Sequence, residues 1–344
     1  MVKKILAGIS GGVDSAVSAL LLQRDGYEVI GCRLLLNDGA GASPDASSAQ
    51  DVAGKLGIKL LQADFRDRFK KEVSDYFISE YLRGRTPNPC IKCNPTVKFA
   101  ALLQIADENN IDFIATGHYA GIRKESDGLC AVRTSPSAKD QSYFLYRLPQ
   151  NVLQRTVFPL GDFLSKEEIR ETARQAGFAA AQKKDSQDIC FIPDNDHIAF
   201  IANHSGVKAV PGDFLDADGK VIGSHSGIFH YTAGQRKGLG AFGEPRYVKY
   251  INAGNNTITL CKAEERFTLT AEVGDLFWTF GKAPDTAKEY GVKIRSTAKA
   301  TLARLAVDGS KMEIKFSSPV MAPCPGQSAV VYDGDTVIGG GYIV

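Results

Sequence analysis

One short stretch near the N-terminus, Ser10 to Ser15, constrains the fold of this chain more than any other feature. It reads Ser-Gly-Gly-Val-Asp-Ser, follows the apolar run Ile5 to Ile9 and precedes the apolar run Ala16 to Leu22. This pattern predicts a buried strand, a glycine-rich turn and a helix. Glycines let the backbone approach an anion, and the amide groups and partial positive charge of a helix N-terminus hold it there. The expected ligand is therefore a nucleotide or another phosphorylated compound.

The turn matches neither of the two common phosphate-binding motifs. A Walker loop needs Gly-x-x-x-x-Gly-Lys-Ser/Thr and a dinucleotide fold needs Gly-x-Gly-x-x-Gly, and neither string is present here. The Ser-Gly-Gly-x-Asp-Ser string instead resembles the loop of the N-type ATP pyrophosphatases. That resemblance implies that the β and γ phosphates of ATP are held as a leaving group while AMP is transferred to a substrate oxygen. The alternative, a strand-to-helix turn without a ligand, is disfavoured by its position directly after the first strand.

Length, charge and cysteine count indicate a multi-domain cytoplasmic enzyme. The 344 residues exceed what one hydrophobic core usually serves, so two or three domains are expected. With 41 basic and 39 acidic residues, the overall charge neither argues for nor excludes a nucleic-acid partner. We find no signal-peptide layout and no apolar run of membrane-spanning length, so no membrane partner is expected. Seven cysteines, an odd number, argue against a disulfide framework and for reactive or metal-binding roles.

The first half of the chain alternates strand and helix patterns, which predicts a doubly wound parallel sheet. The expected strands and helices are Lys4 to Ile9, Glu28 to Leu36, Lys59 to Ala63 and Asp112 to Thr116, and Asp14 to Arg24, Ser47 to Leu56, Arg66 to Arg83 and Val97 to Glu108. Ligands of such sheets bind outside the carboxyl ends of the strands. We therefore expect the Ser10 to Ser15 turn, Leu34 and the Thr116 to Tyr119 stretch to converge around an adenine.

The pattern changes after about residue 195. A Ser165-x-x-Glu168 capping box opens a helix to Ala176, and beyond Val210 short β-type runs are separated by Gly, Asp and Asn. These runs predict small antiparallel barrels. Boundaries near residues 200 and 263 would divide this half in two.

Three cysteines lie in segments that favour function over packing. Cys90 and Cys93 fall in a proline-containing segment expected to be a stiff extended loop between helices, and Cys190 follows Lys183 and Lys184. Lysines at these positions, and Lys92 beside Cys93, would favour the reactive thiolate form. A lone Cys-x-x-Cys is compatible with redox chemistry, with zinc or with no function at all.

Seven strings spread along the chain resemble those of the tRNA-specific 2-thiouridylases. They are the Ser10 to Ser15 turn, Gly84 to Pro89 with Cys93-Asn94, Ala115 to Tyr119, Lys139 to Leu145, Lys184 to Ile192, Gly234 to Gly240 and Pro325 to Val330. The resemblance covers the whole chain. It implies an ATP pyrophosphatase catalytic domain at 1–200, a central tRNA-binding or adaptor domain at 201–263 and a C-terminal β-barrel domain at 264–344. The implied activity is ATP-dependent 2-thiolation of the wobble uridine, position 34, of tRNA.

The resemblance also implies a mechanism. ATP, with Mg²⁺, adenylates the C2 oxygen of uracil and releases pyrophosphate, after which AMP becomes the leaving group. Sulfur arrives as a persulfide on Cys190, loaded by a cysteine-desulfurase relay. Cys93 then attacks the persulfide and ends in a disulfide bond with Cys190, or acts in an equivalent order of events. The implied partners are thus tRNA and a sulfur-donor protein, with no DNA.

The other implied roles are assigned position by position. The ATP-contacting positions are Gly8, Ile9, Ser10, Gly11, Gly12, Val13, Asp14, Ser15, Leu34 and Gly117. Asn88, Pro89 and Cys90 match the strip that touches the target base. The tRNA-contacting positions are His118, Lys139, Asp140, Gln141, Arg295, Ser296 and Gln327. His118 taken alone would be compatible with a packed core histidine.

One departure from the family pattern bears on the chemistry. The commonest form of the motif has aspartate where this chain has Cys90. Cys90 is then either a spare thiol or one of three ligands, with Cys93 and Cys190, of a [4Fe-4S] cluster whose free iron carries hydrosulfide. The persulfide route is favoured, and zinc is disfavoured because no fourth soft ligand is apparent.

Two other functions compete with thiolation. An amide-forming ATP pyrophosphatase would use the turn and would not need Cys93 or Cys190. A tRNA-binding or cluster-carrying protein without catalysis is disfavoured by the intact Asp14 and Ser15.

Overall fold

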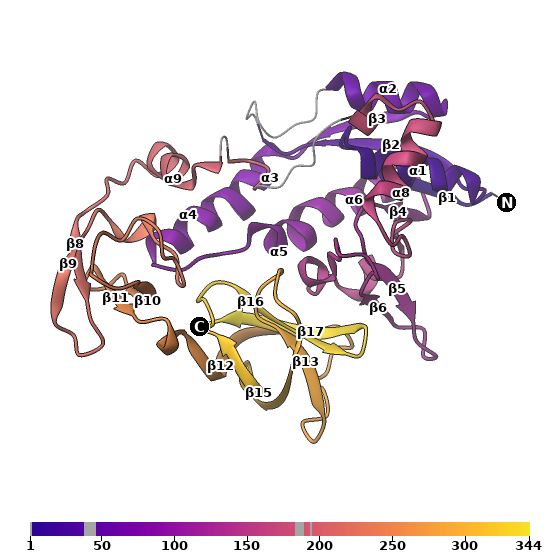
Figure 1. Ribbon diagram of the computed structural model, residues 1–344. Coiled ribbons are helices and arrows are strands. Elements are labelled where there is room, and N and C mark those ends of the chain that lie inside the picture. Colours follow the sequence, from indigo (N-terminus) through magenta and orange to yellow (C-terminus); the bar gives the residue numbers. More distant parts are fainter. Residues whose placement is uncertain (1, 38–45, 183–188, 193–194) are drawn as a thin grey trace.

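The computed structural model describes residues 2–37, 46–182, 189–192 and 195–344. Its N-terminal part is built on a parallel sheet in the order β3-β2-β1-β4-β7 (Figure 1). The strands are β1 (Lys4–Gly8), β2 (Glu28–Leu35), β3 (Leu60–Asp64), β4 (Phe113–Ala115) and β7 (Thr156–Val157). Four of them were predicted from the sequence to within a residue or so.

Helices cover both faces of this sheet because the strands are apolar on both sides. Ile5 and Ala7 of β1 pack with α1 (Val13–Arg24), α2 (Ala46–Leu56) and α8 (Lys166–Gln175). Leu6, which points to the opposite face, packs with α6 (Phe99–Glu108). The doubly wound arrangement is therefore confirmed. The order of strands reverses on either side of β1, which creates the crevice expected at the carboxyl ends of β1 and β4.

The cysteine-containing segment is helical, so the expectation of an extended loop was wrong. Proline at the first position of α5 (Pro89–Cys93) lacks only a backbone donor that a helix start leaves unpaired, and the Asn88 side chain accepts a hydrogen bond from the Cys90 backbone. The π-helical turn η2 (Asn94–Lys98) continues into α6. A similar π-helical turn, η1 (Lys70–Ser74), joins α3 (Arg66–Phe69) to α4 (Asp75–Leu82).

The middle of the chain forms a small mixed sheet in the order β10-β11-β8-β9. The strands are β8 (Gly212–Leu215), β9 (Val221–His225), β10 (Tyr247–Asn252) and β11 (Thr257–Cys261). β11 runs parallel to β8, so the prediction of a wholly antiparallel unit was wrong here. A chain crossover between these two strands is not visible in local sequence periodicity.

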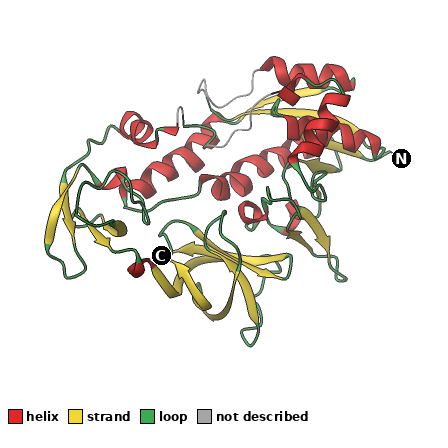
Figure 2. Cartoon of the chain, in the orientation of Figure 1, coloured by secondary structure: helices red, strands yellow, loops and turns green. Residues whose placement is uncertain are grey.

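The C-terminal strands form a barrel that β12 and β17 close. Figure 2 shows this part of the chain, near the C-terminus, as strands and loops. In spatial order the strands are β12 (Phe267–Trp278), β15 (Lys311–Met321), β14 (Thr301–Asp308), β13 (Glu289–Lys293), β16 (Ser328–Asp333) and β17 (Thr336–Ile343). The hairpin of β5 (Gly121–Lys124) and β6 (Cys130–Arg133) extends the barrel sheet, since Arg133 pairs with Thr336. A segment of the first half is therefore hydrogen-bonded to the last strand.

Short helices connect the larger elements. They are η3 (Ser142–Leu145), α7 (Gln150–Leu153), η4 (Ala179–Gln182), α9 (His197–Ser205), η6 (Ile228–His230) and η7 (Glu264–Arg266). The capping box of α8 is confirmed, because Ser165 accepts a hydrogen bond from the Glu168 backbone. No helix in the described ranges is long and apolar enough to span a bilayer.

Candidate active site

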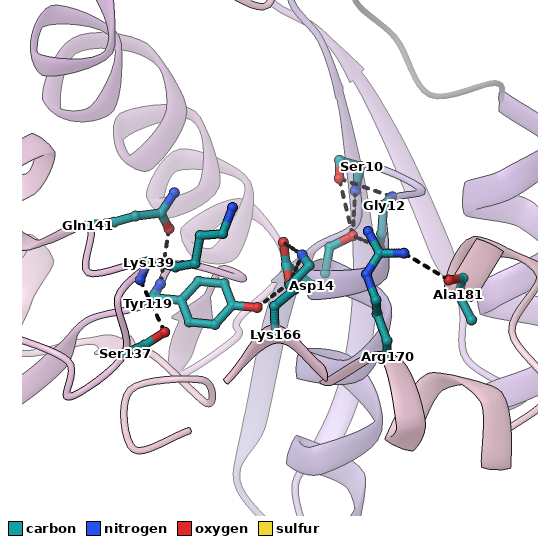
Figure 3. Close-up of polar contacts among 11 residues, drawn as sticks. Ser10, Gly12, Asp14, Tyr119, Ser137, Lys139, Gln141, Lys166, Arg170 and Ala181 are labelled. Carbon is teal, nitrogen blue, oxygen red and sulfur yellow. Dashed lines mark hydrogen bonds and ion pairs between the residues drawn. The ribbon is translucent and has the colours of Figure 1, made fainter. Parts of the chain in front are cut away.

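The glycine-rich turn has the backbone conformation that its sequence predicts. Gly11 has a φ of 83°, a region that residues with a side chain rarely occupy. The Ser15 hydroxyl accepts a hydrogen bond from the Ser10 backbone and donates one to the Gly12 carbonyl. Ser10 in turn accepts a hydrogen bond from the Gly12 backbone (Figure 3). The two serines therefore brace the turn, which leads directly into α1.

Asp14, inside this turn, is held by two residues from other parts of the chain. Both of its carboxylate oxygens lie 2.6 Å from the Nζ of Lys166, and the hydroxyl of Tyr119 donates to Oδ1 at 2.6 Å (Figure 3). The Lys166 side chain is only 9% exposed. Sequence reasoning missed Lys166, although a lysine on the first turn of an otherwise amphipathic helix was a visible signal.

A cavity of about 330 Å³ opens beside the turn, at the carboxyl ends of the central strands. Its lining comprises Gly8, Ile9, Ser10, Asp14, Ser15, Cys32, Arg33, Leu34, Leu36, Asn37, Lys98, Leu102, Thr116, Gly117, His118, Gln141 and Cys190. The predicted convergence of the turn, Leu34 and the stretch after β4 is confirmed. Gly117 must lack a side chain, because a Cβ there would lie 2.9 Å from the backbone of Asp14 and of Ser15. Gly11, Gly12 and Val13 shape the turn and do not line the cavity.

Cys190 reaches this cavity because its neighbour anchors the segment. The ring of Phe191 packs at 5.3 Å from that of Phe69 and at 5.5 Å from that of Phe77, and the same apolar cluster contains Cys93. Cys190 itself is exposed. Lys183 and Lys184, expected to activate it, lie outside the described residues.

The electrostatics of the three thiols differ from expectation. Burial raises the pKa of Cys93 to about 12, and protein atoms that keep water from the sulfurs raise the pKa of Cys90 and of Cys190, although both residues are exposed overall. All seven cysteines are free. The ionised form of each of these three thiols is therefore disfavoured, and the predicted activation by Lys92 is wrong. Its ammonium turns to Glu72, 3.8 Å away.

Lys98 is the cation that acts on the thiols instead. Its charge opposes the effect of burial on the pKa of Cys90, Cys93 and Cys190. It lies at the end of η2 and lines the cavity together with Cys190. It lies five positions after Cys93, a spacing that did not identify it in the sequence.

The donor set fits a magnesium ion only in part and does not fit a metal cluster. Among the described residues that line the cavity, Asp14 is the single carboxylate, and it already faces Lys166. Mg²⁺ commonly keeps waters and substrate phosphates as ligands, so Asp14 with phosphate oxygens would be compatible with it. Among the residues that the structure describes, no group of three or more His, Cys, Asp or Glu side chains is arranged to hold a metal ion. The described positions of Cys90, Cys93 and Cys190 therefore do not fit an iron–sulfur cluster.

The predicted base-contacting residues lie on one short segment beside the thiols. Asn88 caps α5, Pro89 is buried at its first position and Cys90 is exposed at the second. This segment is held from the barrel side: the Thr86 backbone donates to the Pro325 carbonyl at 2.8 Å, and the Gln327 amide donates to the Thr86 carbonyl at 2.8 Å. Gln327, expected to contact tRNA, thus supports the Thr86 to Cys90 segment.

Two of the predicted tRNA-contacting residues line the cavity. His118 stacks on Phe99 with ring centroids 5.7 Å apart, and its Nδ1 lies 2.6 Å from the Thr116 hydroxyl. Burial and the charge of Lys98 hold the pKa of His118 well below its usual range, so the ring is neutral at pH 7. Gln141 accepts a hydrogen bond from the Tyr119 backbone at 3.0 Å (Figure 3).

The remaining predicted tRNA contacts lie outside the cavity lining. The Lys139 backbone donates to Ser137, and Asp140 pairs with Lys293 of the barrel at 3.2 Å. Arg295 donates to the Ala322 carbonyl. Ser296 follows it in the loop after β13.

Three family models match the chain in succession. Residues 3–194 match the tRNA methyl transferase HUP domain, residues 198–262 the tRNA methyl transferase PRC-barrel domain and residues 269–343 the aminomethyltransferase beta-barrel domain. The tRNA-specific 2-thiouridylase MnmA of Clostridium acetobutylicum is 43% identical over 356 residues, covering 100% of both chains. That of Acetivibrio thermocellus is 42% identical over 356 residues, covering 99% of both.

The chain belongs to the tRNA-specific 2-thiouridylase family. Its parallel sheet, mixed sheet and closed barrel agree with the succession of domains that the three models describe.

Solved structures overlap with this 2-thiouridylase family member only in part. The U34-tRNA thiolase NcsA from Methanococcus maripaludis with its [4Fe-4S] cluster is 18% identical, with a TM-score of 0.37, over 59% of this chain and 63% of that one. A 4-thiouridine synthetase in complex with RNA and bound ATP is 19% identical, with a TM-score of 0.36, over 53% and 43%. These overlaps are too low to bear on the site.

Proposed function

We propose that this protein replaces the C2 oxygen of the wobble uridine of tRNA by sulfur in an ATP-dependent reaction. One observation supports this above all: a single cavity is lined both by the phosphate-binding turn, through Ser10 and Ser15, and by the cysteine Cys190. An enzyme that only activates a substrate with ATP needs the turn alone. A thiol in the same cavity supplies the group that replaces the activated oxygen.

The first half of the proposed reaction is activation of the uracil. The C2 oxygen attacks the α-phosphorus of ATP, a C2–O–AMP bond forms and pyrophosphate leaves. The backbone amides of the turn and of the first turn of α1 stabilise the charge on the pyrophosphate. Asp14, together with phosphate oxygens, would hold a Mg²⁺ ion, which would supply further positive charge against the leaving pyrophosphate. Gly8, Ile9, Leu34 and Gly117 bound the space for the nucleoside.

The second half is sulfur transfer. The terminal sulfur of a Cys190 persulfide attacks C2 and AMP leaves, which produces a Cys190–S–S–C2 linkage. The Cys93 thiolate then attacks the Cys190 sulfur, so that the thiolated uridine leaves and a Cys93–Cys190 disulfide forms. An external dithiol reduces that disulfide, and a cysteine-desulfurase relay protein reloads Cys190. Anchoring of Phe191 in the cluster that contains Cys93 supports the pairing of these two cysteines.

We propose that tRNA lies over the Thr86 to Cys90 segment. Asn88, Pro89 and Cys90 would face the target base, and neutral His118 and Gln141 would approach it from the cavity. Five further residues would form the surface around this segment. They would contact tRNA or, where they already bond to other parts of the protein, hold that surface in place. They are Lys139, Asp140, Arg295, Ser296 and Gln327. The protein would act in the cytoplasm, with domain boundaries near residues 200 and 263.

Single-turnover reactions with a cognate tRNA transcript and a persulfide-loaded protein test the proposal. We expect tRNA-dependent release of AMP and pyrophosphate, together with 2-thiouridine at the wobble position detected by mass spectrometry of digested tRNA. Cys190→Ser should still release pyrophosphate and should form no 2-thiouridine. Cys32→Ser, a buried cavity-lining cysteine without a proposed role, is the matched control and should retain product formation.

Three results would contradict the proposal. Equal pyrophosphate release with a small amine and no tRNA would favour an amide-forming enzyme. Transfer of a methyl group from S-adenosylmethionine would favour the activity that two of the family-model descriptions mention. Stoichiometric iron in anaerobically purified protein, lost in Cys90→Ala, would replace the persulfide route by a cluster.

A further inference from the structure

The cavity contains one lysine whose position neither half of the proposed reaction explains. Lys98 ends the π-helical turn η2, is half-buried, and lines the same space as Ser10, Ser15 and Cys190. Within the described part of the chain, no carboxylate is paired with its ammonium. A cation kept partly out of water without a carboxylate partner is costly, so another negative group is expected to face it.

The groups around Lys98 identify what that negative group is. The thiols of Cys90, Cys93 and Cys190 and the imidazole of His118 all respond to its charge, and the thiols also act on one another. Asp14, at the other end of the cavity, already faces Lys166. The side chains that pack around Cys93 are otherwise apolar, among them Phe69, Phe77 and Phe191. Arg33 also lines the cavity, and among the described cations Lys98 is the one whose charge lowers the pKa of all three thiols.

The helix geometry explains why Lys98, and not Lys92, serves the thiols. Lys92 lies next to Cys93 in sequence, yet consecutive residues of a helix point in different directions, and Lys92 extends toward Glu72 and the ring of Tyr76. The wider π-helical turn after Cys93 places Lys98 five positions on, where it lines the same cavity as Cys190.

We propose that Lys98 is the residue that holds the sulfur anions of Cys93 and Cys190 in place at the edge of the nucleotide cavity. It makes no covalent bond and transfers no proton; its ammonium stabilises the persulfide anion before attack on C2 and the Cys93 thiolate before attack on Cys190. This role rests on the proposed sulfur transfer. Its electrostatic basis can be measured without tRNA or ATP.

The test is the pH dependence of alkylation by iodoacetamide, a neutral reagent that reacts with thiolates. The reduced full-length protein is alkylated between pH 6.5 and 10, and modification of Cys90 and Cys190 is followed separately by peptide mass spectrometry. A nearby opposite charge lowers a pKa by about 1–3 units, and Lys98 and Cys190 line one cavity, so Lys98→Met should slow alkylation of Cys190 at pH 8 by about tenfold or more. Lys98→Arg keeps the charge and should restore most of the rate.

Lys92→Met is the matched control, because it removes a lysine from the same segment. It should leave the alkylation profile of Cys190 within about twofold of the parent, in line with the small effect of exposed charges. Lys98→Gln provides a second neutral variant should Lys98→Met fail to fold, as judged by circular dichroism. Unchanged profiles in a folded neutral Lys98 variant, or an equal effect of Lys92→Met, would overturn the proposal.

A second measurement separates this role from the proposed function itself. In persulfide-loaded protein, Lys98→Met should slow 2-thiouridine formation by about tenfold or more while tRNA-dependent pyrophosphate release stays within about threefold. If pyrophosphate release falls as strongly as thiolation, Lys98 serves the nucleotide and the proposal is wrong. If the parent forms no 2-thiouridine at all, the proposed function fails, and the alkylation profile still decides whether Lys98 stabilises the thiolates.

Discussion

The contact between Lys166 and Asp14 ties the phosphate-binding turn to a helix that lies 152 residues further along the chain. Both carboxylate oxygens lie 2.6 Å from the ammonium, and the two side chains are 9% and 33% exposed. Replacing Lys166 by Met leaves the aliphatic volume largely unchanged and removes the charge. The Asp14 carboxylate then keeps the hydroxyl of Tyr119 as a partner and loses its counter-charge.

The size of the effect follows from burial. Removing one partner of a fully buried pair costs about 3–5 kcal/mol, whereas exposed pairs contribute at most about 1 kcal/mol. Asp14 is one-third exposed and retains one hydrogen bond, so we expect Lys166→Met to lower the free energy of unfolding by about 2 kcal/mol. For a unit of 150–250 residues this corresponds to a fall of about 4–8 °C in the melting temperature, measured by calorimetry.

Two further variants test the reasoning. Lys4→Met removes an exposed pair with Glu28, 3.8 Å long with side chains 45% and 53% exposed, and should shift melting by less than about 2 °C. Asp14→Asn introduced into Lys166→Met removes the unpaired charge and should recover part of the lost stability. Equal melting temperatures of Lys166→Met and Lys4→Met would contradict this expectation. A further loss of stability when Asp14→Asn is added to Lys166→Met would contradict it as well.

Three other predictions concern the cavity and its support. Gly117→Ala should weaken ATP binding by about tenfold or more in calorimetric titrations, because its Cβ would push against the backbone of the turn, whereas Gly54→Ala, where the added Cβ meets nothing, should bind ATP normally. Gln327→Leu leaves the Thr86 carbonyl without its 2.8 Å amide donor, and hydrogen exchange in the peptide that contains Thr86 should accelerate several-fold; unchanged exchange there would contradict the support role. His118 has a folded pKa below its unfolded value of about 6.5, so the unfolded chain binds a proton that the folded chain does not. The free energy of unfolding should fall as the pH drops below about 6.5, by up to about 1.4 kcal/mol per pH unit. Urea titrations at several pH values should show that the free energy of unfolding depends less steeply on pH in His118→Asn.

Local sequence patterns were sufficient for the parallel sheet and for its ligand-binding end. The continuous apolar run along β1 predicts a strand buried on both faces, and two glycines before an apolar helix predict an anion-binding turn. Both inferences depend on residues within about ten positions of one another. The convergence of Leu34 and Gly117 on the turn followed from the general topology of such sheets.

The same local reasoning failed at the cysteines. Two prolines suggested an extended loop, but Pro89 stands at the first position of α5, where a missing backbone donor costs nothing. Proximity in sequence favoured Lys92 as the cation beside Cys93, whereas the π-helical turn places Lys98 there. The direction of a side chain depends on the backbone conformation, which the residue types alone did not reveal.

The sequence by itself determined that this protein is an α/β enzyme with an anion-binding turn and with thiols available for chemistry, because strand and helix periodicity and turn composition are local properties. Only the tertiary structure decided which charges meet. Lys166 reaches Asp14 across 152 residues, Cys190 shares a cavity with the turn, and Gln327 of the barrel supports Thr86. Such contacts depend on how separate elements pack, and electrostatic and hydrogen-bond energies depend on the distances and burial that this packing produces.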